Sequence, residues 1–221
     1  MKTKLIHAVV LLPALMAYAD DDNGGRRYAV TITNITARQV FTPIVIASHK
    51  EGVRLFTLGQ PASTPLEILA EGGDTAPLKT MLMANSSVKT VLDSGAPLPP
   101  GQSVTLTIDT RGGFDHVSLA SMLVPTNDAF FALNGVELPE GERTLTVYSP
   151  AYDAGTEAND ELCTRIPGPP SVCAGEGFNA SRAGAEGFVH IHRAIHGVGT
   201  LMAAVWDWRN PVAQITIQRV K

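Results

Sequence analysis

The chain has 221 residues and a formal net charge of −4. A length of this order suits a single all-β domain with a sizeable core rather than two domains. The acidic balance argues against nucleic acid as a partner, since a nucleic-acid-binding surface is normally basic.

The first 19 residues have the pattern of a secretory signal peptide. Lys2 and Lys4 precede an apolar run at residues 5–16, and Ala17 and Ala19 provide the small residues of a cleavage site after Ala19. The apolar run is too short to span a membrane comfortably, and no later segment approaches the roughly 20 apolar residues that a spanning helix requires. We therefore expect a secreted or periplasmic protein without a transmembrane segment in the mature chain.

Residues 20–27 are polar and are expected to form a disordered leader, so the predicted domain covers residues 28–221. Within it, residues 28–36 and 40–49 have the composition of strands, and Pro43 interrupts the second or places it at a sheet edge. Pro65 suits the first turn of a helix that Gly72 and Gly73 end. A second short helix is expected near residues 75–86, so that both helices lie in a crossover between strands.

The second half of the chain contains short runs in which apolar and polar residues alternate, and glycine and proline separate these runs. This pattern favours an all-β fold, an antiparallel β-sandwich with long functional loops, over a fold of alternating strands and helices. The predicted strands cover residues 102–110, 116–125, 142–150, 187–195 and 211–220.

The two cysteines, Cys163 and Cys173, are separated by a loop rich in proline and glycine. In an exported protein this spacing predicts a disulfide. A zinc-thiolate site would require more cysteines or a CxxC spacing.

A crowded acidic stretch, "YDAGTEANDELC", occupies residues 152–163. Like charges at this spacing repel, so the segment needs either full solvation or a bound cation. Ca²⁺ prefers six to eight oxygen ligands on loops, although the spacing here is not that of an EF-hand. A solvated acidic surface is the alternative. The candidate oxygen ligands in this stretch are Asp153, Glu157, Asn159 and Asp160. Glu161 is an outlying acid, and its replacement by glutamine should do little to Ca²⁺ binding.

A second group of oxygen ligands lies in "VPTNDAFFALNG", where Pro125 ends a predicted strand and Asn127 and Asp128 follow. Phe130 and Phe131 come next, in what we expect to be a loop. These aromatics either fold back into the core from a turn or accompany a site in which Asp128 joins the acidic stretch.

Histidines offer a different kind of site. His190 and His192 share one face of a predicted strand and would suit Zn²⁺ or Cu²⁺ if His196 joined them. The alternative is that they are structural or lie on the surface. Nearby, Asp207 and Arg209 should form an ion pair. No GxSxG elbow or phosphate-binding glycine loop is present in the sequence, so nothing in it requires an enzyme.

Three segments together resemble the spondin-N domain, the module of F-spondin and mindin that also occurs in secreted bacterial proteins. They are "SMLVPTNDAFFALNG", "YDAGTEANDE" and the closing stretch from "IHG" to "DWRNPVAQITIQRV". The resemblance extends from about Tyr28 to Val220. Its most specific part, Tyr152 to Glu157, looks like the family signature "YDAGT" followed by an acid.

The resemblance implies a C2-like antiparallel β-sandwich with a Ca²⁺ site among loops at one end. Asp128, Asp153 and Glu157 fall on acidic positions of the family pattern, and Phe130 and Phe131 would present apolar surface beside the ion. The implied function is adhesion or recognition of an extracellular or cell-surface protein or glycan, without catalysis. Two alternatives stay open: a metal-dependent enzyme that uses His190, His192 or His196, and a purely structural exported protein.

Overall fold

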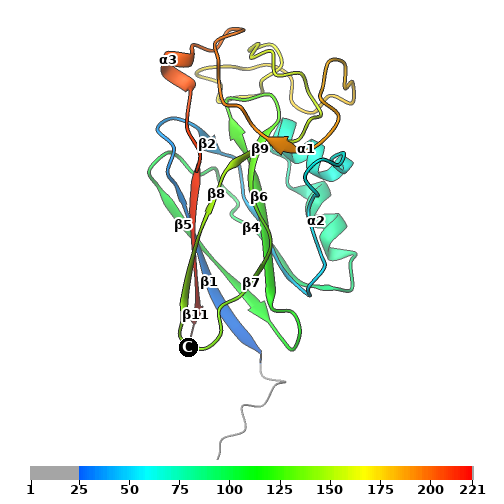
Figure 1. Ribbon diagram of the computed structural model, residues 1–221, viewed down its shortest axis with the longest axis vertical. Coiled ribbons are helices and arrows are strands. Elements are labelled where there is room, and N and C mark those ends of the chain that lie inside the picture. The colour runs from blue at the N-terminus through cyan, green and yellow to red at the C-terminus, as the bar shows by residue number, and fades with distance from the viewer. Residues whose placement is uncertain (1–24, 221) are drawn as a thin grey trace, which may run out of the picture.

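The computed structural model describes residues 25–220, so the predicted signal peptide and most of the predicted leader lie outside the described residues. Two antiparallel sheets face each other, and two helices cover the outer face of the larger sheet (Figure 1). The predicted all-β sandwich is confirmed. The two helices, α1 (Thr64–Gly72) and α2 (Ala76–Met83), lie between strands as predicted. They connect β3 to β4, which are hydrogen-bonded antiparallel neighbours, so the connection is not a crossover.

The smaller sheet has the order β5-β1-β11-β8, and the larger has the order β10-β9-β7-β6-β3-β4, with β2 paired to β6. All recorded strand pairs are antiparallel. The strands of the smaller sheet are β1 (Arg26–Asn34), β5 (Ser103–Thr110), β8 (Thr144–Ser149) and β11 (Ala213–Val220). Those of the larger sheet are β2 (Val40–Phe41), β3 (Val45–His49), β4 (Val88–Asp93), β6 (His116–Val124), β7 (Ala129–Glu137), β9 (Ala151–Asp153) and β10 (His190–Ile191).

Several boundaries differ from the sequence prediction. The run around Pro43 is divided into β2 and β3, because proline has no backbone N–H to donate to a neighbouring strand. Only two residues of the expected strand at 187–195 pair, as β10. At the other end of the domain, Arg26 and Arg27 belong to β1 and not to a disordered leader.

The larger sheet is buried on both faces. One face packs against the smaller sheet through side chains such as Ile46 and Leu119, and the other packs under α1 through Val45 and Ala120. Nearly all of β6 is therefore buried, and its sequence shows no regular alternation of apolar and polar residues. A sandwich covered by helices on one side thus has two cores.

Phe130 and Phe131 correct the prediction that these aromatics present surface beside an ion. Both are fully buried in β7, and because neighbouring strand residues point to opposite faces, they enter different cores. Phe131 contacts Phe41 between the sheets, with ring centroids 4.2 Å apart. Phe130 lies in the core under α1, edge-to-face with Phe56.

A long irregular segment, residues 154–212, covers one end of the sandwich and contains only β10 and the short helix α3 (Ala203–Trp206) (Figure 1). We call this end the loop end. The predicted disulfide between Cys163 and Cys173 is confirmed and closes one part of this segment. No helix in the described part of the chain is long and apolar enough to cross a membrane.

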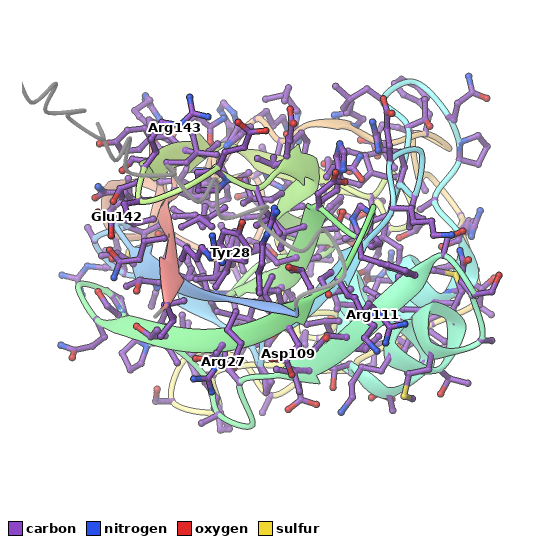
Figure 2. All side chains as sticks on the ribbon, turned by 90° about the horizontal axis from the view of Figure 1, so that it is seen from below. Arg27, Tyr28, Asp109, Arg111, Glu142 and Arg143 are labelled. Atoms are coloured by element: carbon purple, nitrogen blue, oxygen red, sulfur yellow. A yellow bond between two sulfur atoms is a disulfide. The ribbon has the colours of Figure 1, made fainter. Side chains whose placement is uncertain are left out.

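The opposite end of the sandwich holds the first and last described strands side by side, since Arg27 pairs with Val220. Figure 2 views the molecule from this end, where Arg27, Glu142 and Arg143 are labelled. A depression of about 520 Å³ lies here, lined in part by Arg26, Glu142 and Arg219. It is remote from the acidic stretch and takes no part in the site described below.

Candidate functional site

The two oxygen-rich loops meet at the loop end, as their positions after strands predict. Asp128 directly precedes β7, Asp153 ends β9, and these two strands pair with Ala129 opposite Asp153. The backbone N–H of Ala154 donates to the carbonyl of Asp128 at 3.2 Å. Adjacent strand ends therefore bring two carboxylates together that are 25 residues apart in the sequence.

Asp128 is fully buried, and only one of its two carboxylate oxygens has a partner. Its Oδ2 accepts backbone N–H groups from Thr156 at 2.8 Å and Glu157 at 3.1 Å. Its Oδ1 has no hydrogen-bond partner. Burial raises the pKa of this carboxyl well above its usual value, and the neighbouring Asp153 raises it further.

Asp153 is also fully buried, but both of its oxygens are engaged. Oδ1 accepts the backbone N–H of Gly155, and Oδ2 accepts the side-chain N–H of Asn159, each at 2.8 Å. Burial is the largest cause of its raised pKa, which these hydrogen bonds and His190 partly offset. The first turn of the acidic stretch is thus folded around the carboxylate of Asp153.

The Glu157 side chain lies against Glu71 of α1 and not with Asp153, and we call Glu71 and Glu157 the acid pair. Burial and then the charge of Glu71 raise the pKa of Glu157 to about 8. Burial also raises the pKa of Glu71, whose Oε2 accepts the backbone N–H of Asn179 at 2.9 Å. One oxygen of each carboxylate is buried without a partner.

Sequence reasoning missed Glu71. The available signal was its spacing, because Glu67 and Glu71 are four residues apart and therefore lie on one side of the helix that also buries Leu66 and Leu69. Glu67 is paired with Arg182, whose Nε lies 2.7 Å from Glu67 Oε1. Arg182 also acts on Glu71, but burial outweighs it and leaves the pKa of Glu71 raised. A buried acid with a raised pKa is a candidate for a functional site.

The other two expected ligands have different neighbours. Asp160 is paired with Arg165 at 3.3 Å and accepts the side-chain N–H of Asn127 at 3.2 Å. Asn159 donates to the carboxylate of Asp153. The five residues expected to bind one ion are therefore divided. Asp128, Asp153 and Asn159 lie together, Glu157 belongs to the acid pair, and Asp160 forms a half-buried ion pair with Arg165.

Glu161, which was expected to lie outside the calcium site, has a structural role that the sequence did not indicate. It is buried, and its carboxylate accepts three consecutive backbone N–H groups, from His196 at 2.6 Å, Gly197 at 2.7 Å and Val198 at 2.9 Å. Its own backbone has a φ of 56°, in the left-handed region. Glu161 thus holds the loop that follows β10 against the acidic stretch.

The three histidines do not converge on one point, so the structure does not form the three-histidine site that the sequence left open as an alternative. His192 is buried and stacks on Trp208 with ring centroids 5.2 Å apart, whereas His196 is exposed and lies against the carbonyl of Arg193. Burial lowers the pKa of His192 to about 3. His190 and His192 instead lie on either side of Asp153, within reach of its two oxygens at 3.5 Å and 3.7 Å.

The "DWRNPV" segment supports this arrangement from the other side. The predicted ion pair between Asp207 and Arg209 is confirmed. Trp208 provides the ring under His192, and Asn210 Oδ1 accepts the backbone N–H of Ala151 at 2.8 Å. The segment therefore fixes both β9 and the buried histidine.

Gly155 should not tolerate alanine. Its φ of 66° is left-handed, and an added Cβ would lie 2.2 Å from the carbonyl oxygen of Phe188. The left-handed conformation alone costs alanine about 1–2 kcal/mol, and the clash adds to that. We expect Gly155→Ala to lower the denaturation midpoint clearly, whereas Gly141→Ala, which has a similar φ and open space around it, should show the conformational cost alone. Equal midpoints for the two variants in urea would contradict this packing.

The protein is a β-sandwich module of two facing antiparallel sheets. Buried carboxylates lie together in the loops at the loop end. The family model described as Spondin_N matches residues 32–163, more than half of the chain. The chain therefore belongs to the spondin-N family, which suggests an extracellular module of the recognition or adhesion type. The disulfide fits an extracellular protein. No curated protein matches the chain.

Proposed function

We propose that the protein is an exported recognition module whose loop end is held in shape by Ca²⁺ and binds an extracellular or cell-surface protein or glycan. The observation that carries the proposal is the set of buried carboxylate oxygens without a partner at this end. They are Asp128 Oδ1, Glu71 Oε1 and Glu157 Oε2.

These residues fit a hard divalent cation. Carboxylate oxygens are the ligands that Ca²⁺ prefers, and a buried anion without a cation is costly. Glu157 and Glu71, which act on each other's charge, would hold the ion, which supplies positive charge that neutralises the carboxylates; Asp128 lies instead beside Asp153. Glu71 belongs to α1 and Glu157 to the acidic stretch, so a shared cation would join the helix layer to the loop end. Compared with the sequence-based set, Glu71 is added to Glu157. Asp128, Asp153 and Asn159 stay together as a separate group, and Asp160 is left with Arg165.

Apolar side chains at the loop end support recognition as the function. Among the described residues, six of the eleven large apolar side chains that are exposed lie within residues 162–202. Met202 and Val198 are the most exposed of these, at 64% and 63%. Such a gathering is typical of a surface that binds another molecule. The six are Leu162, Phe178, Phe188, Ile191, Val198 and Met202.

Calcium binding can be measured on the chain from residue 20 onward, without an affinity tag. We expect Ca²⁺ with an affinity in the range of about 10⁻⁴–10⁻³ M that is common in extracellular modules. At a concentration 100-fold above Kd, it should stabilise the fold by about 2.7 kcal/mol. Glu157→Gln should weaken binding at least tenfold, whereas Glu140→Gln, which removes an exposed carboxylate, should not. If calorimetry detects no uptake at millimolar Ca²⁺, the calcium proposal fails.

Recognition is tested separately, by binding the same chain to arrays of glycans and of extracellular-matrix proteins with Ca²⁺ and with chelator. We expect binding that needs Ca²⁺ and that Val198→Asp together with Met202→Asp abolishes, because a charge at the contact must be desolvated. Replacement of the exposed Leu92 by Asp, on β4, is the control. Binding that survives the pair of loop-end substitutions would contradict the proposed surface.

A further inference from the structure

A second cluster of metal-ligating side chains lies beside the acid pair and is separate from it. His190 Nε2 is 3.5 Å from Asp153 Oδ1 and 3.9 Å from Glu186 Oε2, and one atom from each residue lies within 4.8 Å of the others. His190 Nε2 is itself buried without a hydrogen-bond partner. The cluster has one imidazole and two carboxylates, whereas the acid pair has oxygen atoms alone.

Backbone contacts determine which nitrogen of each histidine carries the proton. His190 Nδ1 lies 3.0 Å from the carbonyl oxygen of Ile191, which can only accept, so Nδ1 carries a proton and, in the neutral ring, Nε2 presents a lone pair. In His192 the order is reversed, because its Nδ1 accepts the backbone N–H of Ala194 at 2.9 Å. The Nε2 of neutral His192 therefore carries the proton and faces Asp153 Oδ2.

This assignment gives the two histidines different roles. His192 presents an N–H to the Asp153 carboxylate and leaves no lone pair for a metal. Neutral His190 presents a lone pair to two carboxylates, which also offer only lone pairs, and such an arrangement is repulsive unless a metal ion lies among them or a proton occupies Nε2. An N–H of a metal-binding histidine is commonly bound to a backbone carbonyl, as Nδ1 of His190 is here.

Asn159 orients the two carboxylates. Its side-chain N–H group donates to Asp153 Oδ2 at 2.8 Å and to Glu186 Oε1 at 3.1 Å. One oxygen of each carboxylate is thus held by the amide, and the other, Asp153 Oδ1 or Glu186 Oε2, is the one nearest His190. Outer groups that orient ligands in this way are typical of metal sites.

We propose that Asp153, Glu186 and His190 bind a divalent transition ion of the Zn²⁺ type. Bonds of about 2.0–2.1 Å in a tetrahedral site place ligand atoms roughly 3.3 Å apart, close to the separations found here. A nitrogen ligand favours zinc over calcium, which prefers oxygen. Glu186 is exposed, so the ion can enter from solvent, and a fourth position remains for water or for a group of a binding partner.

Zinc calorimetry on the untagged chain from residue 20, with Ca²⁺ present at a saturating concentration, tests this site. We expect one Zn²⁺ per chain. His190→Gln and Glu186→Gln should each weaken zinc binding by about tenfold or more, and Asn159→Ala should weaken it by about tenfold. His196→Gln is the matched control, because it removes an exposed histidine of the same loop and should leave zinc affinity unchanged.

Calcium affinity separates this proposal from the previous one, because His190→Gln leaves the acid pair intact. We expect its calcium binding to stay within twofold of the unsubstituted chain, and Co²⁺ in place of Zn²⁺ should give absorption bands that His190→Gln removes. Glu186→Gln, at an exposed position, keeps the test valid if the histidine variant fails to fold. Zinc affinity that changes equally in His190→Gln and His196→Gln, or no zinc binding at all, would overturn the proposal.

Discussion

Replacement of Glu161 by glutamine should lower the stability of the protein by about 2–4 kcal/mol, because a buried N–H that loses its acceptor costs about 1–3 kcal/mol. Glutamine keeps one oxygen but places an NH₂ group where the other oxygen was. If the oxygen remains near Gly197 and Val198, the NH₂ group faces the N–H of His196, and two donors repel.

The measurement is urea unfolding at neutral pH, with Glu140→Gln as the control for the same chemical change at an exposed site. A loss of 2–4 kcal/mol corresponds to a drop of roughly 5–15 °C in the melting temperature for a domain of this size. Amide hydrogen exchange should show faster exchange at residues 196–198 in the Glu161 variant. Unchanged stability would mean that the three donors find water as an equivalent acceptor.

Without Ca²⁺, the protein should become less stable as the pH rises from about 7 to 8. Glu157 has a folded-state pKa of about 8, and the pKa of Asp128 is raised as well, whereas both groups titrate near pH 4 when the chain is unfolded. The folded state therefore binds more protons in this window, and its stability falls by up to about 1.4 kcal/mol per pH unit through Glu157.

The histidines contribute little to the change in stability between pH 7 and 8. Burial lowers the pKa of His49 and His192, so both are neutral when folded, and unfolded histidines have mostly lost their protons by pH 7. Their contribution is opposite in sign and belongs to lower pH, where the unfolded state binds more protons.

Saturating Ca²⁺ should reverse the trend, since the ion binds ionised carboxylates and competes with protons for them. Chemical unfolding of the unsubstituted chain and of Glu157→Gln, from pH 6 to 9 with chelator and with Ca²⁺, measures the effect. Glu157→Gln should show a flatter pH dependence without Ca²⁺. If the stability measured with chelator rises between pH 7 and 8, the raised pKa values are contradicted, and the calcium proposal loses its basis.

The fold could be predicted where one face of a strand meets the core and the other meets water. Alternation in β1 and β11 shows their strand character directly. Alternation does not identify β7, because the run from Ala129 to Leu133 is buried on both faces. From the sequence alone, this run is therefore predicted to be a loop that contains two aromatic residues. The helices were predictable from Pro65, Gly72 and Gly73, because these residues act locally.

The site was predictable only in part for a similar reason. Asp128 and Asp153 could be placed together because both stand at strand ends. Glu71 comes from a helix 86 residues before Glu157, and only tertiary packing brings the two together. The opposite roles of His190 and His192 depend on contacts with backbone groups one or two residues away, which no pattern of side chains reveals.

The pairing of Arg27 with Val220 places both ends of the described chain at the pole of the sandwich opposite the loop end (Figure 1). A surface, a bead or a fused protein attached through either of these strands would therefore leave the loop end pointing outward. The two attachment points lie side by side, so many copies anchored through either strand would present their loop ends in the same orientation. Such a geometry would allow multivalent binding, in which the weak contacts of single copies combine into a stronger overall attachment.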